Sequence, residues 1–157
     1  MRYVIAIVAF LNCGYAWAGN VTVTAAWARA SAPGQESAAV YLRIVSQQAA
    51  RLVAVTSPLA DSAEIHSMTH DNGIMKMRAL EALPLPAQQE VELGSGGTHL
   101  MLQELKRPLK AGSNVPLVFI IQFADGHKER VKVKAEVKPF TFGEKGHEYQ
   151  HPSDSKQ

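Results

Sequence analysis

Residues 63–80, AEIHSMTHDNGIMKMRAL, place two strand-like runs, 63–69 and 74–80, on either side of Asp71-Asn72-Gly73. An Asn-Gly pair between two such runs is the strongest short signal for a β-hairpin, because both central residues of a type I′ turn need a positive φ. With Asn72 and Gly73 at the turn centre, Met68 lies opposite Met77 and His70 lies opposite Met75. The stretch therefore predicts an antiparallel hairpin of defined register.

The rest of the chain repeats this pattern of short runs separated by turn residues. Periodicity and composition predict further strands at 21–29, 39–45, 51–56, 90–93, 99–102, 115–123 and 130–137. Turn signals such as Ala32-Pro33-Gly34 and Asp125-Gly126 separate them, and no window has a convincing helical period. We therefore predict a single all-β domain, an antiparallel Greek-key β-sandwich, with a Greek-key barrel as the alternative.

The N-terminus has the layout of a secretory signal peptide. Residues 3–11 form a nearly unbroken apolar run, and Ala16-Trp17-Ala18 matches a small-x-small cleavage site. We predict a removed segment 1–18, a domain 19–140, a polar flexible tail 141–157 and a periplasmic location. One alternative is a buried N-terminal strand or helix. Another is lipidation at Cys13, which the preceding Leu11-Asn12 fits poorly because small residues usually precede a lipidated cysteine.

Composition excludes several classes of function. The net charge is only +2 without a basic block, so no nucleic-acid partner is expected. No apolar run of about 18 residues follows the N-terminal segment, so no transmembrane segment is expected there. The chain shows no paired carboxylates at a catalytic spacing, no nucleophile elbow and no phosphate loop, so we predict that it is not an enzyme. We expect a monomer.

Methionine and histidine gather in one third of the sequence. All four methionines after Met1 and three of the six histidines fall within residues 66–101: His66, Met68, His70, Met75, Met77, His99 and Met101. Side chains at i and i+2 share a face of a strand, so His66 with Met68, Met75 with Met77, and His99 with Met101 form three such pairs. This clustering indicates a metal site.

The donor types indicate which metal. Thioether sulfur is soft and imidazole is borderline, and a set without thiolate or carboxylate suits Cu(I) best. The one cysteine, Cys13, lies in the predicted signal peptide, so the mature chain has no thiolate for a blue-copper electron-transfer centre. The alternative is that methionine fills the core and the histidines are ordinary surface residues, as in a structural or adhesive β-sandwich.

The spacing resembles that of the periplasmic copper chaperones of the PCu(A)C family, whose signature is a histidine, ten residues, a methionine, twenty-one residues and His-x-Met. His66, Met77 and His99-Leu100-Met101 reproduce it, and the likeness runs from about Val21 to Val137. The resemblance implies a cupredoxin-like sandwich that binds one Cu(I) per chain through His66, Met77, His99 and Met101. It also implies copper supply to an acceptor such as a cytochrome c oxidase subunit, alongside a Sco-like thioredoxin-fold protein.

Other histidines and methionines receive lesser roles. We interpret Met68, His70 and Met75 as neighbours of the ligands or as residues on the path by which copper enters. Some family members have a His/Met-rich tail that binds Cu(II); here the tail offers only His147 and His151, which would make at most a weak site. Copper sequestration for tolerance, without a dedicated acceptor, stays open as an alternative to delivery.

Overall fold

The computed structural model describes residues 19–141, and these residues form ten β-strands and no helix. The strands are β1 (Val21–Arg29), β2 (Ser37–Ser46), β3 (Ala50–Thr56), β4 (Ala60–Asp71), β5 (Ile74–Leu80), β6 (Leu83–Leu85), β7 (Glu90–Leu93), β8 (Thr98–Leu105), β9 (Asn114–Phe123) and β10 (Lys128–Lys138). The described residues thus include no helix of the length and apolar character that crossing a bilayer requires.

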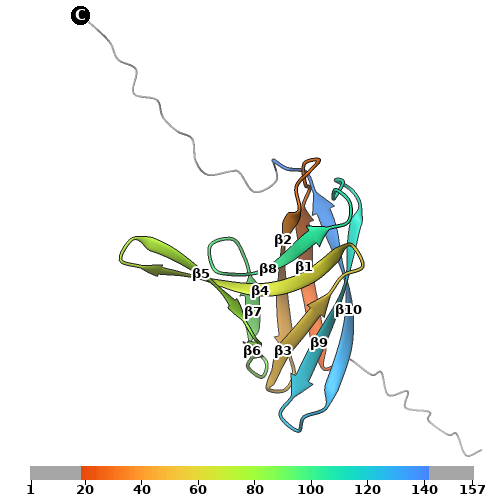
Figure 1. Cartoon of the computed structure of the whole chain (residues 1–157). Helices are drawn as coiled ribbons and strands as arrows, with labels where there is room; N and C mark the ends of the chain where they lie inside the picture. Colours follow the sequence, from red (N-terminus) through yellow and green to blue (C-terminus); the bar gives the residue numbers. More distant parts are fainter. Residues whose placement is uncertain (1–18, 142–157) are drawn as a thin grey trace, which may run out of the picture.

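The strands form one curled sheet in the order β5-β4-β8-β2-β1-β10-β9-β3-β6, with β7 on the same edge of β2 as β8. β3 contacts β4, and β2 contacts β6, although neither pair lies side by side in this order, so the sheet folds over on itself. Figure 1 shows the resulting body, from which the β4–β5 hairpin projects to one side.

The interior is built from alternate residues of the strands. Along β2 and β9 every second side chain points inward, and Val40, Ile44, Phe119 and Ile121 are fully buried. β8 contributes Leu100 and Leu102 to the same core. The residues that alternate with them, His99 and Met101, therefore lie on the opposite face. The alternation that buries the core therefore also determines which β8 side chains can form a site.

The predicted fold class is confirmed, with three differences in detail. Most strands are longer than predicted by one to three residues at an end. β6 is not among the predicted strands; because it is an edge strand, it tolerates Pro84. The prediction of an antiparallel sheet was wrong for β1 and β10, which pair in parallel with Trp27 beside Glu136.

The hairpin turn has the predicted conformation. Asn72 and Gly73 have φ values of 49° and 79°, as a type I′ turn requires. Met68 pairs with Met77 and His70 with Met75, so the predicted register is confirmed. β4 pairs with β8 only as far as Ser67, so the remainder of the hairpin has no other partner strand among residues 19–141.

The terminal segments 1–18 and 142–157 lie outside the described residues. The signal peptide with Cys13, and the tail histidines His147 and His151, therefore stay predictions from sequence.

Leu100→Ala should destabilise the fold strongly, because Leu100 is completely buried between the two β8 residues of the cluster. A truncated core leucine costs about 2–5 kcal/mol of unfolding free energy. Ile74→Ala is the control, since Ile74 is 63% exposed and its loss should change that free energy by no more than about 0.5 kcal/mol. Urea unfolding followed by circular dichroism measures both. Equal losses would show that the core is not where the structure has it.

Gly73→Ala should weaken the hairpin while leaving the body intact. A Cβ at Gly73 meets no atom within 4 Å, so the cost comes only from its positive φ, about 1 kcal/mol. Amide hydrogen exchange should speed up in β5, while amides of β9 keep their protection. Uniformly faster exchange in β9 as well would contradict this separation of hairpin and body.

Candidate functional site

The two histidines of the cluster face each other across β4 and β8. His66 is the direct partner of His99 in the antiparallel register, and their ring centroids lie 5.9 Å apart at an interplanar angle of 74°. Directly opposed residues project to the same face of a sheet, so both imidazoles lie on one side. Two residues 33 positions apart in sequence, 99 minus 66, therefore form one pair.

Met77 reaches this pair from β5, which pairs with β4 on the edge opposite to β8. Met77 and Ala79 are alternate residues of β5 and point to the same face, and Ala79 is the direct partner of His66. The Met77 Sδ atom lies 3.2 Å from Nδ1 of His66. The thioether sulfur of Met77 and a ring nitrogen of His66 are thus in direct contact.

Met101 completes the predicted set on the third strand. It follows His99 by two residues on β8, so it shares that face, and it is the direct partner of Glu64 on β4. Its half-buried side chain lines a hollow of about 250 Å³ with Tyr41, Arg29 and Phe140. The structure thus brings His66, Met77, His99 and Met101 to one face of the adjacent strands β5, β4 and β8.

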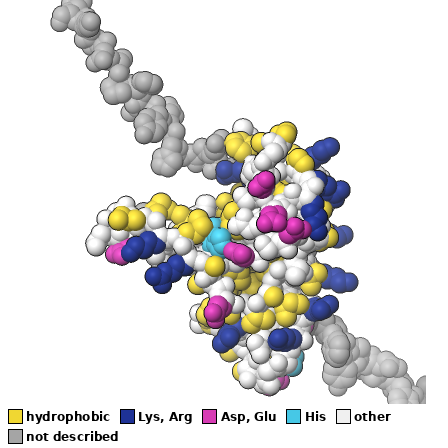
Figure 2. All heavy atoms as spheres, in the orientation of Figure 1, with side chains coloured by type: hydrophobic (Ala, Val, Ile, Leu, Met, Phe, Trp, Pro, Cys, Tyr) yellow, Lys and Arg dark blue, Asp and Glu magenta, His cyan; other side chains and the backbone are white. Residues whose placement is uncertain are grey.

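The four side chains differ greatly in exposure. His99 is 6% exposed and the His66 side chain is 12% exposed, whereas Met77 is 55% exposed. Figure 2 shows a histidine at the root of the projecting hairpin and hydrophobic side chains along the hairpin itself. The site is therefore anchored in the sheet at its histidine side and open to solvent on its hairpin side.

The remaining residues of the predicted cluster lie farther along the hairpin. Met68, half-buried, pairs with Met77, and the 52% exposed Met75 follows toward the turn as the partner of His70. By strand alternation Met68 and Met75 share the face of His66. The role of Met68, His70 and Met75 as neighbours of the site or as an approach path stays a prediction.

Glu64 is the site residue that sequence reasoning missed. It is not among the residues that the sequence predicts for the site, but its Oε2 lies 2.9 Å from Nε2 of His66. The signal was available in the sequence, because Glu64 precedes His66 by two residues and therefore shares its face. His99 has a comparable partner, since its Nδ1 lies 3.1 Å from the carbonyl oxygen of Gly97.

An aromatic pair extends the same face beyond Met101. Tyr41 follows Ala39, the β2 partner of Met101, by two residues, and Tyr41 itself pairs with Trp27 on β1. The two rings are 4.6 Å apart and both side chains are half-buried. Trp27 therefore packs against Tyr41 at the border of the site.

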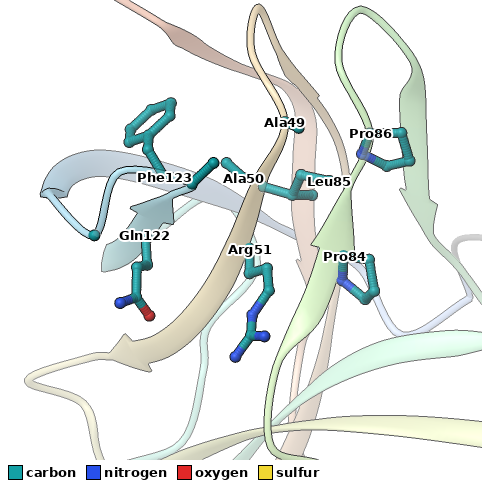
Figure 3. Close-up of a pocket in the computed structure, with 10 residues that line it drawn as sticks. Ala49, Ala50, Arg51, Pro84, Leu85, Pro86, Gln122 and Phe123 are labelled. Carbon is teal, nitrogen blue, oxygen red and sulfur yellow. The ribbon is translucent and has the colours of Figure 1, made fainter.

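Other features of the molecule lie away from the histidine pair. Within residues 19–141 no group of three or more His, Cys, Asp or Glu side chains could hold a metal. A hollow of about 520 Å³ lies between β3, β6 and the end of β9, and Arg51, Pro84, Leu85 and Phe123 line it (Figure 3). It contains neither methionine nor histidine and is separate from the cluster.

His127 belongs to a turn far from the cluster. It is half exposed and stacks on Phe123 with centroids 4.4 Å apart. Its backbone N–H donates to the Asp125 carboxylate over 3.1 Å, and this bond, together with the side-chain contact to His127, lowers the pKa of Asp125. These bonds order the β9–β10 turn.

Solved structures share this fold. The apo PCuAC domain from PmoF1 is 25% identical with a TM-score of 0.62, over 77% of this chain and 95% of that domain. The solution structure of CuI-DR1885 from Deinococcus radiodurans is 35% identical with a TM-score of 0.60, over 78% of this chain and 81% of that one. The copper-bound PCuAC domain from PmoF2, at 22% identity and a TM-score of 0.61 over 77% and 94%, supports the fold alone. The predicted cupredoxin-like sandwich is thereby confirmed.

Sequence comparisons identify the family. The family model described as "Putative lipoprotein LpqE-like" matches residues 21–137, which is all but the ends of the chain. A relative described as "Putative lipoprotein Lxx21020", from Leifsonia xyli subsp. xyli (strain CTCB07), is 32% identical over 117 residues, covering 74% of this chain and 69% of that protein. The chain is therefore a member of the LpqE-like family with the fold of PCuAC domains.

Proposed function

We propose that the protein is a copper chaperone that holds one Cu(I) between His66, Met77, His99 and Met101 and passes it on by ligand exchange. The observation that carries the proposal is the cross-strand pair His66–His99 with the Met77 sulfur 3.2 Å from His66. Two imidazole nitrogens and thioether sulfurs on one face are a donor set that favours Cu(I). A neighbour of 35% identity is a Cu(I) form, which supports the same cargo here.

Ligand exchange follows from neutral donors of unequal exposure. An acceptor with thiolates binds Cu(I) more tightly than thioethers do, so transfer runs downhill with copper remaining Cu(I) throughout. Met77, more than half exposed, is the ligand that an acceptor reaches first, whereas His99 is nearly buried and leaves last. The sheet therefore retains copper until the acceptor has replaced the hairpin ligand.

We further propose that this occurs in the periplasm and supplies the copper centres of cytochrome c oxidase, alongside a Sco-like protein. The LpqE-like description and the Leifsonia relative both refer to lipoproteins, which supports a location in the cell envelope. Whether residues 1–18 are cleaved after Ala18 or Cys13 is lipidated, the domain lies outside the cytoplasm. A deletion strain separates delivery from sequestration: delivery predicts loss of oxidase copper, whereas sequestration predicts copper sensitivity with oxidase intact.

Replacing one histidine and one methionine should abolish tight copper binding. In a Cys13→Ser background, which removes the thiol, His99→Ala plus Met101→Ala should reduce Cu(I) binding from about one equivalent to none when measured against a competing chelator. His127→Ala plus Met75→Ala is the matched control, with the same residue types changed away from the proposed ligands, and should keep the equivalent. Undiminished binding in the first variant would refute the site.

Two methionines of equal exposure allow the ligand to be distinguished from its neighbour. Met75 and Met77 are 52% and 55% exposed on the same face of β5, so hydrogen peroxide should oxidise both to the sulfoxide at similar rates in the metal-free protein. Loading with Ag(I), a redox-inert substitute for Cu(I), should protect Met77 and leave Met75 unprotected, as measured by peptide mass spectrometry. Protection of Met75 instead of Met77 would contradict the assignment.

A further inference from the structure

The two histidines of the site have different hydrogen-bond partners on different ring nitrogens. Nε2 of His66 lies 2.9 Å from a Glu64 carboxylate oxygen, whereas Nδ1 of His99 lies 3.1 Å from the carbonyl oxygen of Gly97. Carboxylate and carbonyl oxygens only accept hydrogen bonds, so each of these ring nitrogens carries the proton and donates. In the neutral rings the lone pair is then on Nδ1 of His66 and on Nε2 of His99.

The free nitrogen of His66 points into the site. Nδ1 is the atom 3.2 Å from the Met77 sulfur, and with the proton on Nε2 neither atom has a hydrogen to offer the other. Two lone-pair donors thus face each other at close range. Both atoms can therefore donate a lone pair to one cation.

Glu64 is placed to impose this state. It lies two residues before His66 on β4, so both side chains leave the same face, and its direct partner across the sheet is Met101. The Glu64 side chain is 49% exposed while that of His66 is 12% exposed, so the carboxylate remains hydrated while it holds a mostly buried ring. A hard carboxylate is a poor ligand for Cu(I), and Glu64 has its hydrogen-bond acceptor role instead.

We propose that Glu64 is a positioning residue that fixes His66 in the Nε2–H tautomer, so that His66 binds Cu(I) through Nδ1 while His99 binds it through Nε2. This proposal rests on the proposed function and adds the atoms by which each histidine acts. A carboxylate that accepts the second N–H of a ligand imidazole orients the ring and makes the other nitrogen a better donor, and losing such a partner typically lowers metal affinity 10–100-fold. Its negative charge also offsets the charge of the bound Cu(I).

The metal-free protein provides the first test. Long-range ¹H–¹⁵N correlation spectra at alkaline pH, where imidazole is neutral, report which nitrogen of each ring carries the proton. We expect Nε2–H for His66 and Nδ1–H for His99 in the unchanged protein, and a mixture of tautomers for His66 alone in Glu64→Ala. A His66 ring in the Nδ1–H form, or one unaffected by Glu64→Ala, would overturn the proposal.

Metal binding provides the second test. Glu64→Ala should lower Cu(I) affinity 10–100-fold, and Glu64→Gln should lose less, because an amide oxygen can accept the same hydrogen bond. Asp61→Asn is the matched control: it removes a carboxylate at the start of the same strand, where Asp61 pairs with Lys106 over 3.2 Å, and should leave the affinity unchanged. On loading with Ag(I), the ¹⁵N signals of Nδ1 of His66 and Nε2 of His99 should shift most.

The outcomes distinguish this proposal from the proposed function. If the unchanged protein binds neither Cu(I) nor Ag(I), the function fails, whereas the tautomers in the metal-free protein still report on Glu64. If the protein binds Cu(I) but Glu64→Ala and Asp61→Asn retain equal affinity, or if Nε2 of His66 receives the Ag(I), the function stands and the role of Glu64 is wrong. Circular dichroism of each variant shows that a loss is not caused by unfolding.

Discussion

The buried pair Ile65–Leu100 is the interaction on which the site depends. These residues are direct partners across β4 and β8, with exposures of 5% and 0%. Because side chains alternate along a strand, burying this pair places the partners on either side of it, His66 with His99 and Glu64 with Met101, on the opposite face. A slip of one residue would exchange the two faces at the cost of the core, so hydrophobic burial holds the polar residues in register.

The strands that carry the four residues differ in how firmly they are held. β8 lies between β4 and β2, whereas β5 is the edge strand and pairs only with β4 in the described part of the chain. His99 thus belongs to an internal strand and Met77 to the least supported one. Elements with few partners open at low free-energy cost. A site with ligands on both strands can hold a cation through the internal strand β8 while the edge strand β5 leaves that cation accessible. Exchange between proteins requires this combination.

The hairpin could be predicted in detail because its signal is local. Asn72-Gly73 specifies the turn type, and the turn specifies that Met68 opposes Met77, without reference to any other strand. The choice of His66, Met77, His99 and Met101 as ligands rests instead on the resemblance in motif spacing, and it stays a prediction. Such patterns describe what each strand presents on its faces, and the structure agrees with them wherever the pairing partner is the next strand in sequence.

Pairing between distant strands lies beyond such patterns. Nothing in the run Thr98–Leu105 specifies that His99 meets His66, since the same alternation would fit any neighbour. The parallel pairing of β1 with β10 was missed for this reason, and Pro84 concealed β6 because proline marks both turns and edge strands. Spacing places Glu64 on the face of His66, but its contact with Nε2 also depends on the orientation of the His66 ring, which no spacing reveals.

The two imidazoles are oriented by acceptors of different kinds, and this difference affects how the site can be adjusted. His99 donates to the backbone carbonyl of Gly97, a group that every residue at that position would supply. His66 donates to the side chain of Glu64, which a single substitution can remove or replace. The acceptor for His99 is thus independent of the residue type at position 97, whereas the acceptor for His66 depends on the residue at position 64. A substitution at position 64 can therefore change how the His66 ring is oriented without disturbing the strand register that assembles the site.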